Sequence, residues 1–189
     1  MQYLYSRLVE DSKWYSEKHP AVTAIAEGWR NWLYSRASLT ERLIAFSGDH
    51  FEVRVLSQRW GKPLLHEANM LNIPIHLAVR VREVELYCNG MPMVFARSVM
   101  PQQVFLDQRH VLANIGTRPL GHLLFKDGQM RASKRSVSLY QAKRGPVIYG
   151  RSTPYRYAQK EILVSEFFIN PSLISWLKLY STKSPSQPK

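Results

Sequence analysis

Two arginines on one segment are the residues of this 189-residue sequence whose placement first suggests chemistry. Residues 79–100 predict two strands joined at Asn89-Gly90, because both central residues of a type I′ turn need positive φ. A two-residue loop places Arg82 directly opposite Arg97 on a face that is otherwise apolar. Like charges repel there, so an anion between them would stabilise the pair. The alternatives are arginines that extend into water at a sheet edge, or a three-residue loop that moves Arg82 opposite Ser98.

A carboxylate lies on the apolar side of a later predicted strand. Glu166 alternates with Ile162, Val164 and Phe168, so all four share one face. An ionised carboxylate is costly there unless a cation pairs with it. Glu166 is therefore either half of a buried ion pair, or a proton donor or acceptor in a pocket. Arg151, on the preceding strand, is either a surface charge or a further contact to an anion.

The sequence lacks the motifs of metal and nucleotide sites. None of the six histidines lies at metal-ligand spacing from another histidine or from Cys88. HExxH, CxxC, Walker, GxGxxG and nucleophile-elbow patterns do not occur. We therefore expect no metal and no cofactor. The two arginines and the glutamate suit a small, partly apolar anion bound inside the domain by an enzyme that needs no cofactor.

Length and composition indicate one globular domain. Hydrophobic residues form 45% of the chain, and no apolar run is long enough to span a membrane. The first residues lack the apolar core of a secretory signal, and a single cysteine fits a reducing compartment, so we expect a cytoplasmic protein. The net charge is +12, and residues 128–160 contain lysines and arginines but no acidic residue. Such a block attracts nucleic acid, anionic lipid or an anionic substrate, or is a solvated face.

The pattern of elements predicts an α+β domain over residues 1–180, with a disordered basic tail at 181–189. We expect an antiparallel sheet of about six strands with helices on one side. The predicted helices span residues 21–34, 39–46, 104–113 and 120–125, and 64–71 is a helical turn or a loop. The Ser38-Leu-Thr-Glu41 motif is a capping box for the second helix. The predicted strands span residues 51–58, 79–88, 91–100, 130–141, 147–157 and 162–169.

Several segments together resemble the chorismate–pyruvate lyase family. The similar segments are VREVELY from Val81, ARSVMP from Ala96, LANIGTRPLGHLLF from Leu112, YGRS from Tyr149 and VSEFF from Val164. The resemblance implies a cofactor-independent enzyme that removes pyruvate from chorismate to give 4-hydroxybenzoate for ubiquinone synthesis. It also implies an antiparallel sheet with an interior ligand site beneath helical flaps.

The resemblance assigns roles to individual residues. An arginine at the position of Arg82 holds the ring carboxylate, assisted by the backbone N–H of Leu120. A glutamate at the position of Glu166 binds the ring hydroxyl, and Leu39 aligns with a flap residue that touches the ligand. Ala96 replaces a family glycine and Leu39 a residue that is usually Met. Both departures are small and apolar.

The substrate has a second carboxylate, on its enolpyruvyl ether. We expect Arg97, helped by Arg151, to hold this group and to stabilise charge as it departs. Arg82, Arg97 and Glu166 are thus the expected catalytic residues.

Other functions remain open at this stage. Regulator effector domains of similar fold bind small molecules without converting them, although they follow a DNA-binding module for which this chain has too few preceding residues. A basic nucleic-acid-binding protein is a second alternative, but aromatic residues are not interleaved with the basic block. We expect a monomer whose partners are chorismate and 4-hydroxybenzoate, with a peripheral contact to an anionic membrane as another use of the charge.

Overall fold

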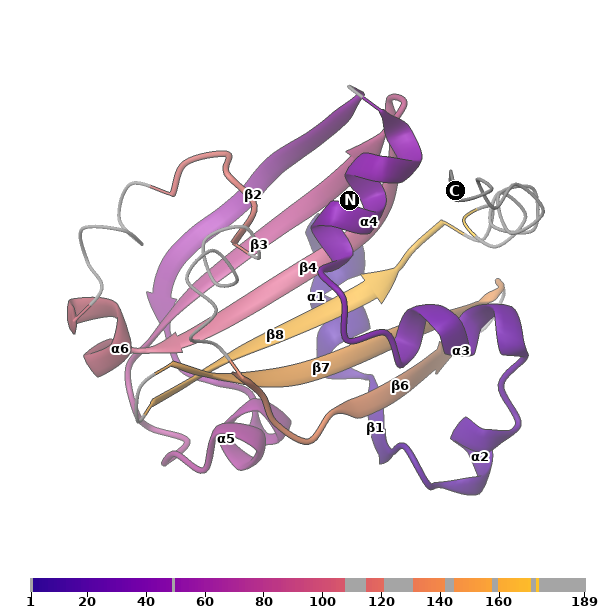
Figure 1. Ribbon diagram of the computed structural model, residues 1–189. Helices are drawn as coiled ribbons and strands as arrows, with labels where there is room; N and C mark the ends of the chain where they lie inside the picture. The colour runs from indigo at the N-terminus through magenta and orange to yellow at the C-terminus, as the bar shows by residue number, and fades with distance from the viewer. Residues whose placement is uncertain are drawn as a thin grey trace, which may run out of the picture.

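The sheet is the element on which the helices of the described residues pack. The computed structural model describes residues 2–48, 50–107, 115–120, 131–141, 145–157, 160–170 and 173. The predicted tail at 181–189 lies outside the described residues, as do most of the helices predicted for 104–113 and 120–125. Figure 1 shows the strands forming one twisted sheet with helices around it.

All strand pairs are antiparallel, and eight strands are present in the described part of the chain. Their order is β1-β6-β7-β8-β4-β3-β2, and β5 pairs with β7. The strands are β1 (Lys13–Ser16), β2 (Phe51–Gly61), β3 (Val79–Cys88), β4 (Met91–Pro101), β5 (Arg131–Ala132), β6 (Ser136–Gln141), β7 (Val147–Tyr157) and β8 (Lys160–Phe168). The α+β class with an antiparallel sheet is confirmed. The sheet exceeds the expected six strands because β1 and β5 are too short to show alternation.

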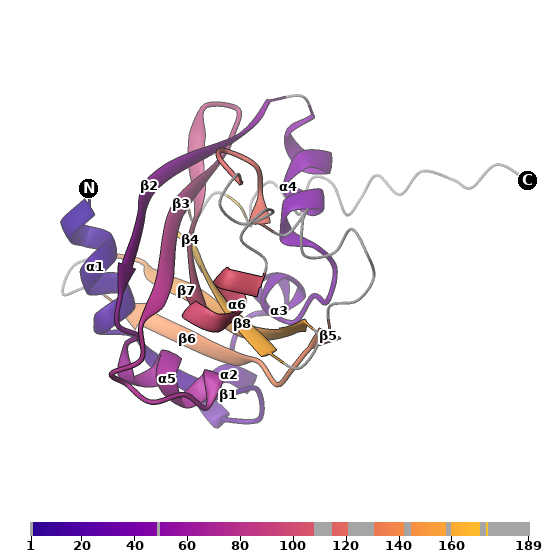
Figure 2. The same ribbon diagram turned by 90° about the vertical axis from the view of Figure 1, so that its left-hand side faces the viewer.

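Helices cover both faces of the sheet, so the prediction that they lie on one side is wrong (Figure 2). They are α1 (Gln2–Glu10), α2 (Pro20–Thr23), α3 (Glu27–Leu33), α4 (Leu39–Ser47), α5 (Leu65–Leu71) and α6 (Gln102–Asp107). The cause lies in the central strands, because β4 is buried continuously from Met93 to Pro101 and therefore needs cover on both faces. We call the face beneath α3 and α4 the inner face, and the face beneath α1 and α5 the outer face.

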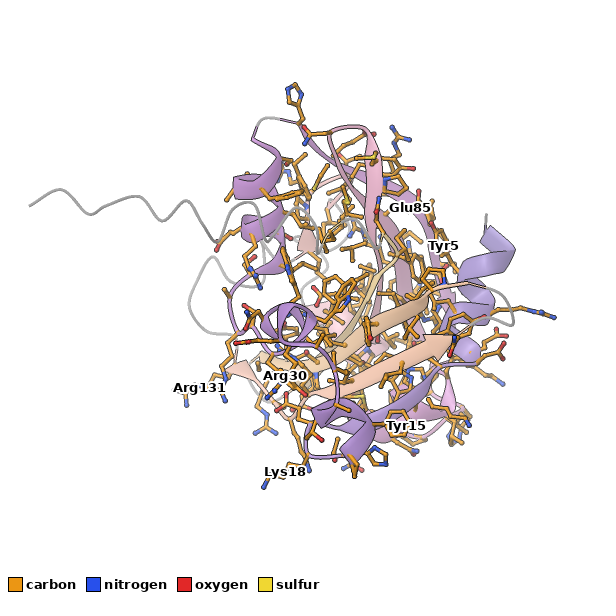
Figure 3. All side chains as sticks on the ribbon, turned by 90° about the vertical axis from the view of Figure 1, so that its right-hand side faces the viewer. Tyr5, Tyr15, Lys18, Arg30, Glu85 and Arg131 are labelled. Atoms are coloured by element: carbon orange, nitrogen blue, oxygen red, sulfur yellow. The ribbon has the colours of Figure 1, made fainter. Side chains whose placement is uncertain are left out.

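The outer face holds a buried glutamate that has no role in the cavity described below. Tyr5 of α1 stacks on Phe95, with ring centroids 4.5 Å apart. The Tyr5 hydroxyl donates a hydrogen bond to Glu85, and the Tyr87 hydroxyl donates to the same carboxylate at 3.1 Å. Burial, with this carboxylate, raises the pKa of Tyr5, so the hydroxyl remains a donor. Figure 3 shows Tyr5 and Glu85 close together beside α1.

Local capping sets the position of α4. The Ser38 side chain accepts a hydrogen bond from the backbone N–H of Glu41 at 3.3 Å, as the capping motif predicts. Gly48 follows the last residue of α4 with φ of +59°, a conformation that favours glycine. The single helix predicted for residues 21–34 is interrupted, since α2 ends at Thr23 and α3 begins at Glu27.

The β3–β4 hairpin confirms the predicted turn and corrects the predicted register. Asn89 and Gly90 have φ of +51° and +75°, as a two-residue type I′ turn requires. A β-bulge follows, because Tyr87 pairs with Pro92 and Leu86 with Val94. Because β4 has one additional residue at the bulge, every β4 residue beyond the bulge lies on the opposite face of the sheet from the one predicted.

The pairing of Arg82 with Arg97 is therefore wrong. Arg82 lies opposite Ser98, and Arg97 lies opposite Glu83. The two arginines extend from opposite faces of the sheet, since side chains alternate along each strand.

No helix among the described residues is both long enough and apolar enough to cross a lipid bilayer.

Candidate active site

The register brings the predicted site residues together on the inner face. Two adjacent rows of paired residues cross the strands in the order β3, β4, β8, β7. The first row is Arg82, Ser98, Val164 and Thr153, and the second is Val84, Ala96, Glu166 and Arg151. Arg82 and Glu166 thus lie in neighbouring rows, with only β4 between their strands, although they are 84 positions apart in the sequence.

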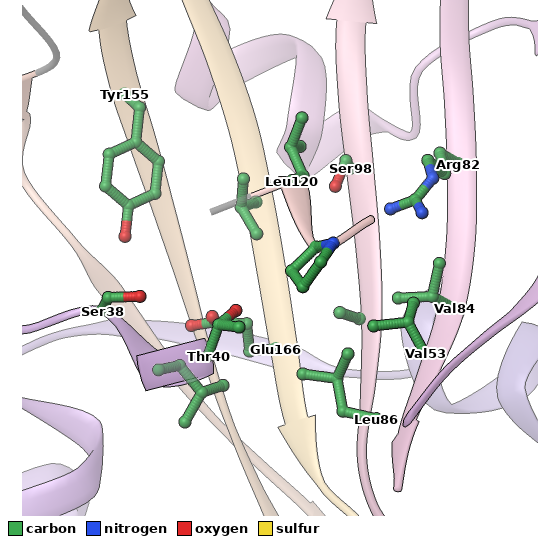
Figure 4. A pocket seen from close by; sticks show the side chains of 14 residues that line it. Ser38, Thr40, Val53, Arg82, Val84, Leu86, Ser98, Leu120, Tyr155 and Glu166 are labelled. Carbon is green, nitrogen blue, oxygen red and sulfur yellow. The ribbon is translucent and has the colours of Figure 1, made fainter. Parts of the chain in front are cut away.

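A cavity of about 50 Å³ lies over these rows (Figure 4). The sheet forms its floor, and residues from α4 and the segment 115–120 close it from above. Its walls between the polar groups are apolar. The lining residues are Ser38, Leu39, Thr40, Val53, Arg82, Val84, Leu86, Ala96, Ser98, Pro119, Leu120, Tyr155, Val164 and Glu166.

Arg82 forms one polar end of the cavity. Its side chain is 2% exposed, and its Nη2 donates to the carbonyl oxygens of Gly116 and Arg118 at 3.0 and 3.1 Å. These bonds hold the guanidinium in place, but neither neutralises its charge. Among the described residues no carboxylate pairs with Arg82, and its Nε has no hydrogen-bond partner.

Burial lowers the pKa of Arg82 to about 10. The group therefore remains a cation at neutral pH while it lacks a counter-ion within the described structure. A buried cation of this kind is stabilised when an anion binds beside it.

Glu166 forms another polar group of the cavity, and a cation holds it from behind. Arg151 donates from Nε to Glu166, and its Nη1 donates to the carbonyl oxygens of Trp32 and Ser35 at 2.7 and 3.1 Å. Burial opposes the charge of Arg151, but Glu166 raises the pKa of the guanidinium above its usual value. Glu166 is therefore half of a buried ion pair, and its carboxylate also lines the cavity, the position that a proton donor or acceptor would need.

Arg97 does not reach the cavity, because the bulge turns it to the outer face. Its Nε donates to Glu67 at 2.7 Å and its Nη1 donates to Glu83 at 2.7 Å. Glu67 is fully buried and also accepts from the backbone N–H of Leu64 at the start of α5. The carboxylates neutralise Arg97, so its geometry gives it a structural role in attaching α5 to the sheet.

Of the other expected contact residues, Leu39 and Leu120 line the cavity and Arg151 does not. Leu39, in the first turn of α4, and Leu120, after Pro119, both reach it, and Ala96 contributes a methyl group to the floor. Arg151 lies directly behind Glu166 and is absent from the lining. The structure therefore brings Arg82, Leu39, Leu120 and Glu166 to one cavity.

The hydroxyl groups of the cavity were not predicted from the sequence. Tyr155, Ser38, Thr40 and Ser98 all line it. Tyr155 could have been found, because it lies four residues beyond Arg151 and therefore on the same face of the predicted strand. The position of Ser38 depends on how α4 packs on the sheet, for which the sequence holds no local signal.

Close contact between β7 and β8 behind the ion pair depends on Gly150. A Cβ atom there would lie 2.8 Å from Cδ1 of the fully buried Phe167 ring. We expect Gly150→Ala to lower the free energy of unfolding by about 1–3 kcal/mol, because the packed ring cannot move away. Urea unfolding measures this change. Gly61→Ala is the control, since its Cβ would meet only the Arg59 side chain at 3.6 Å, and an equal loss in both variants would contradict the expectation.

The cavity can bind a flat, mostly apolar molecule with an anionic group at Arg82 and a hydroxyl group at Glu166. Charge-assisted hydrogen bonds at both ends would fix its orientation, and the apolar walls would exclude water. No group of three or more His, Cys, Asp or Glu side chains in the described residues is arranged to hold a metal ion.

Comparison with known proteins gives one family. The family model described as "Chorismate lyase" matches residues 10–178. A protein of Methylococcus capsulatus named "Probable chorismate pyruvate-lyase" is 36% identical over 77% of this chain and 96% of its own length. A protein of the same name from Psychromonas ingrahamii is 34% identical over 87% of this chain and 94% of its own length.

Solved structures share the fold at low sequence identity. PhnF from Mycobacterium smegmatis superimposes with a TM-score of 0.54 and 9% identity, over 71% of this chain and 64% of that chain. The ligand-binding domain of a GntR-family regulator from Bordetella bronchiseptica gives a TM-score of 0.51 and 17% identity, over 65% and 88% of the two chains. At these identities the similarity shows the fold alone.

Proposed function

The chain belongs to the chorismate lyase family, and from this premise we propose that it eliminates pyruvate from chorismate to give 4-hydroxybenzoate. The observation that carries the proposal is the cavity with a buried arginine at one end, a glutamate beyond apolar walls, and α4 above. In this proposal the protein is a cytoplasmic, monomeric enzyme of the first step of ubiquinone synthesis and needs no cofactor.

The ring carboxylate of chorismate binds Arg82 in this proposal. The guanidinium donates one hydrogen bond to each of the two carboxylate oxygens, and the backbone N–H of Leu120 donates a further hydrogen bond. The substrate thus supplies the counter-ion that Arg82 lacks within the described residues. Because the Gly116 and Arg118 carbonyls already hold Nη2, the guanidinium needs little reorganisation when the substrate arrives.

Glu166 accepts a hydrogen bond from the ring 4-hydroxyl and takes the proton from C4. The Arg151 guanidinium pairs with this carboxylate and fixes its direction. The electron pair of the C4–H bond forms the new ring double bond, and the C3–O bond breaks with its electron pair on the departing enolpyruvate. Protonation of the enolpyruvate methylene carbon gives pyruvate. Aromatisation drives the reaction, so positioning and charge stabilisation suffice.

The direct test is incubation of the purified protein with chorismate and a chelator. We expect 4-hydroxybenzoate and pyruvate in equal amounts, identified by mass, without added metal. An absence of both products at saturating chorismate would contradict the proposal. Tight binding of 4-hydroxybenzoate without turnover would instead indicate a sensor, the function class of the regulators that share the fold.

A further inference from the structure

Tyr155 is one of the polar groups of the cavity that the proposed contacts to the product do not involve. Tyr155 lies on β7, whereas Arg82 lies on β3 and Glu166 on β8. Figure 4 shows Arg82 and Tyr155 on opposite sides of the cavity with Glu166 between them, and the Tyr155 hydroxyl points toward Ser38. Arg82, Tyr155 and Glu166 thus come from three different strands, and the hydroxyl groups of Ser38, Thr40 and Ser98 complete the polar part of the lining.

Polar groups in addition to Arg82 and Glu166 suit the substrate better than the product. 4-Hydroxybenzoate has two polar substituents, a carboxylate and a hydroxyl on opposite carbons of the ring. Chorismate has a third, the enolpyruvyl ether on C3, next to the carbon that carries the hydroxyl. With the carboxylate at Arg82 and the hydroxyl at Glu166, the C3 substituent extends to one side of the line between them. Tyr155 lies on the β7 side of that line, on the strand next to the one that carries Glu166.

The protein behind Tyr155 carries excess positive charge. Arg135 is 7% exposed, and it donates from Nε to Thr153 Oγ1 at 2.9 Å and from Nη1 to the Leu33 carbonyl at 2.7 Å. No ion pair among the described residues includes Arg135. The buried charges of the inner face, within the described residues, are three arginines against one glutamate, namely Arg82, Arg135, Arg151 and Glu166. In the part of the chain that the structure describes, these groups leave two positive charges without a buried carboxylate, so this face favours a ligand with two negative charges.

Building on the proposed function, we propose that Tyr155 is a catalytic residue whose hydroxyl donates a hydrogen bond to the C3 ether oxygen of the substrate. The bond strengthens as the C3–O bond breaks and negative charge develops on that oxygen, so Tyr155 stabilises the departing enolpyruvate. Arg135 acts through Tyr155 and Thr153 as a positioning residue, and its charge favours the enolpyruvyl carboxylate on this side. This arrangement takes over the task that sequence analysis assigned to Arg97.

The protonation state of Tyr155 agrees with a donor role. Burial, and then the Glu166 carboxylate, raise the pKa of the hydroxyl, while Arg151 and Arg135 act in the opposite direction. The hydroxyl therefore carries its proton throughout the neutral range.

The test compares catalysis with product binding in Tyr155→Phe. We expect kcat/KM for chorismate to fall by roughly 10- to 100-fold, because one hydrogen bond to a developing charge is lost. We expect the Kd of 4-hydroxybenzoate, measured by calorimetry, to change less than about twofold, since the product lacks the ether oxygen. Tyr149→Phe is the matched control: it lies on the same strand and face, packs on Trp29 with centroids 4.9 Å apart, and is absent from the cavity lining.

Each outcome separates the inference from the proposed function. A wild-type protein that does not convert chorismate would contradict the proposed function, and the inference with it. An active wild type with an equally active Tyr155→Phe would overturn the inference alone. A parallel loss of kcat/KM and product affinity would also overturn it, because Tyr155 would then hold the ring hydroxyl or the fold.

Discussion

Replacing Arg82 with alanine is expected to lower kcat/KM for chorismate by about 100- to 10,000-fold. The alanine variant would lose two charge-assisted hydrogen bonds to the ring carboxylate, each contributing about 1.5–3 kcal/mol. Affinity for 4-hydroxybenzoate should fall in parallel, because substrate and product share this carboxylate. Steady-state kinetics and calorimetry measure the two effects.

Stability separates a binding role of Arg82 from a structural one. In the ligand-free protein Arg82 is a buried cation without a carboxylate partner among the described residues, so its removal relieves a desolvation cost. The melting temperature of Arg82→Ala should therefore stay unchanged or rise. Arg59→Ala, on the exposed edge of the sheet, should keep wild-type activity. Wild-type turnover in Arg82→Ala would remove that residue from the site.

Glu166→Gln is expected to lower both activity and stability. The amide keeps the shape of the side chain but cannot take the C4 proton, so kcat should fall by about 100-fold or more. Arg151 would then be a buried cation without its carboxylate, which costs about 3–5 kcal/mol of the free energy of unfolding. Kinetics and chemical denaturation report the two losses separately.

Two further variants separate the roles of Glu166. Glu85→Gln changes a glutamate that is buried on the outer face between Tyr5 and Tyr87, so it should lower stability without lowering kcat. Adding Arg151→Met to Glu166→Gln should recover part of the stability, because the unpaired cation is removed, but no activity. An unimpaired kcat in Glu166→Gln would leave Glu166 with a binding role only.

The hairpin shows how far local sequence determines this fold. Asn89-Gly90 determined the turn, because few residue pairs accept two positive φ values. The bulge after the turn depends on how β4 packs between β3 and β8, a long-range effect with no signature in the hairpin sequence. One additional residue was enough to separate Arg82 from Arg97.

Long-range packing also limits what the sequence predicts about the helices. The amphipathic spacing of Tyr5, Leu8 and Val9 was present in the sequence, but nine residues without strong capping signals gave too little periodicity to predict α1. Its partner surface on Phe95 and Phe167 is assembled only when β4 and β8 pair.

The candidate site was predictable where single residues broke an apolar pattern. Arg82 and Glu166 stood out because charges on apolar strand faces are costly, and both line the cavity. Arg97 is also a charge within an apolar pattern, but it does not line the cavity, because it neutralises Glu67 of α5 on the outer face. Tyr155 and Arg135 broke no pattern, and their importance follows from which side chains the sheet register places around Glu166.

A crystal structure with 4-hydroxybenzoate tests the central claim most directly. The account predicts the ligand inside the cavity, with its carboxylate within hydrogen-bond distance of the Arg82 guanidinium and its hydroxyl against Glu166. Tyr155 should lie beside the ring carbon next to the hydroxyl, without a bond to the ligand carboxylate. A ligand in the reverse orientation, or bound outside the cavity lined by Arg82 and Glu166, would contradict the account.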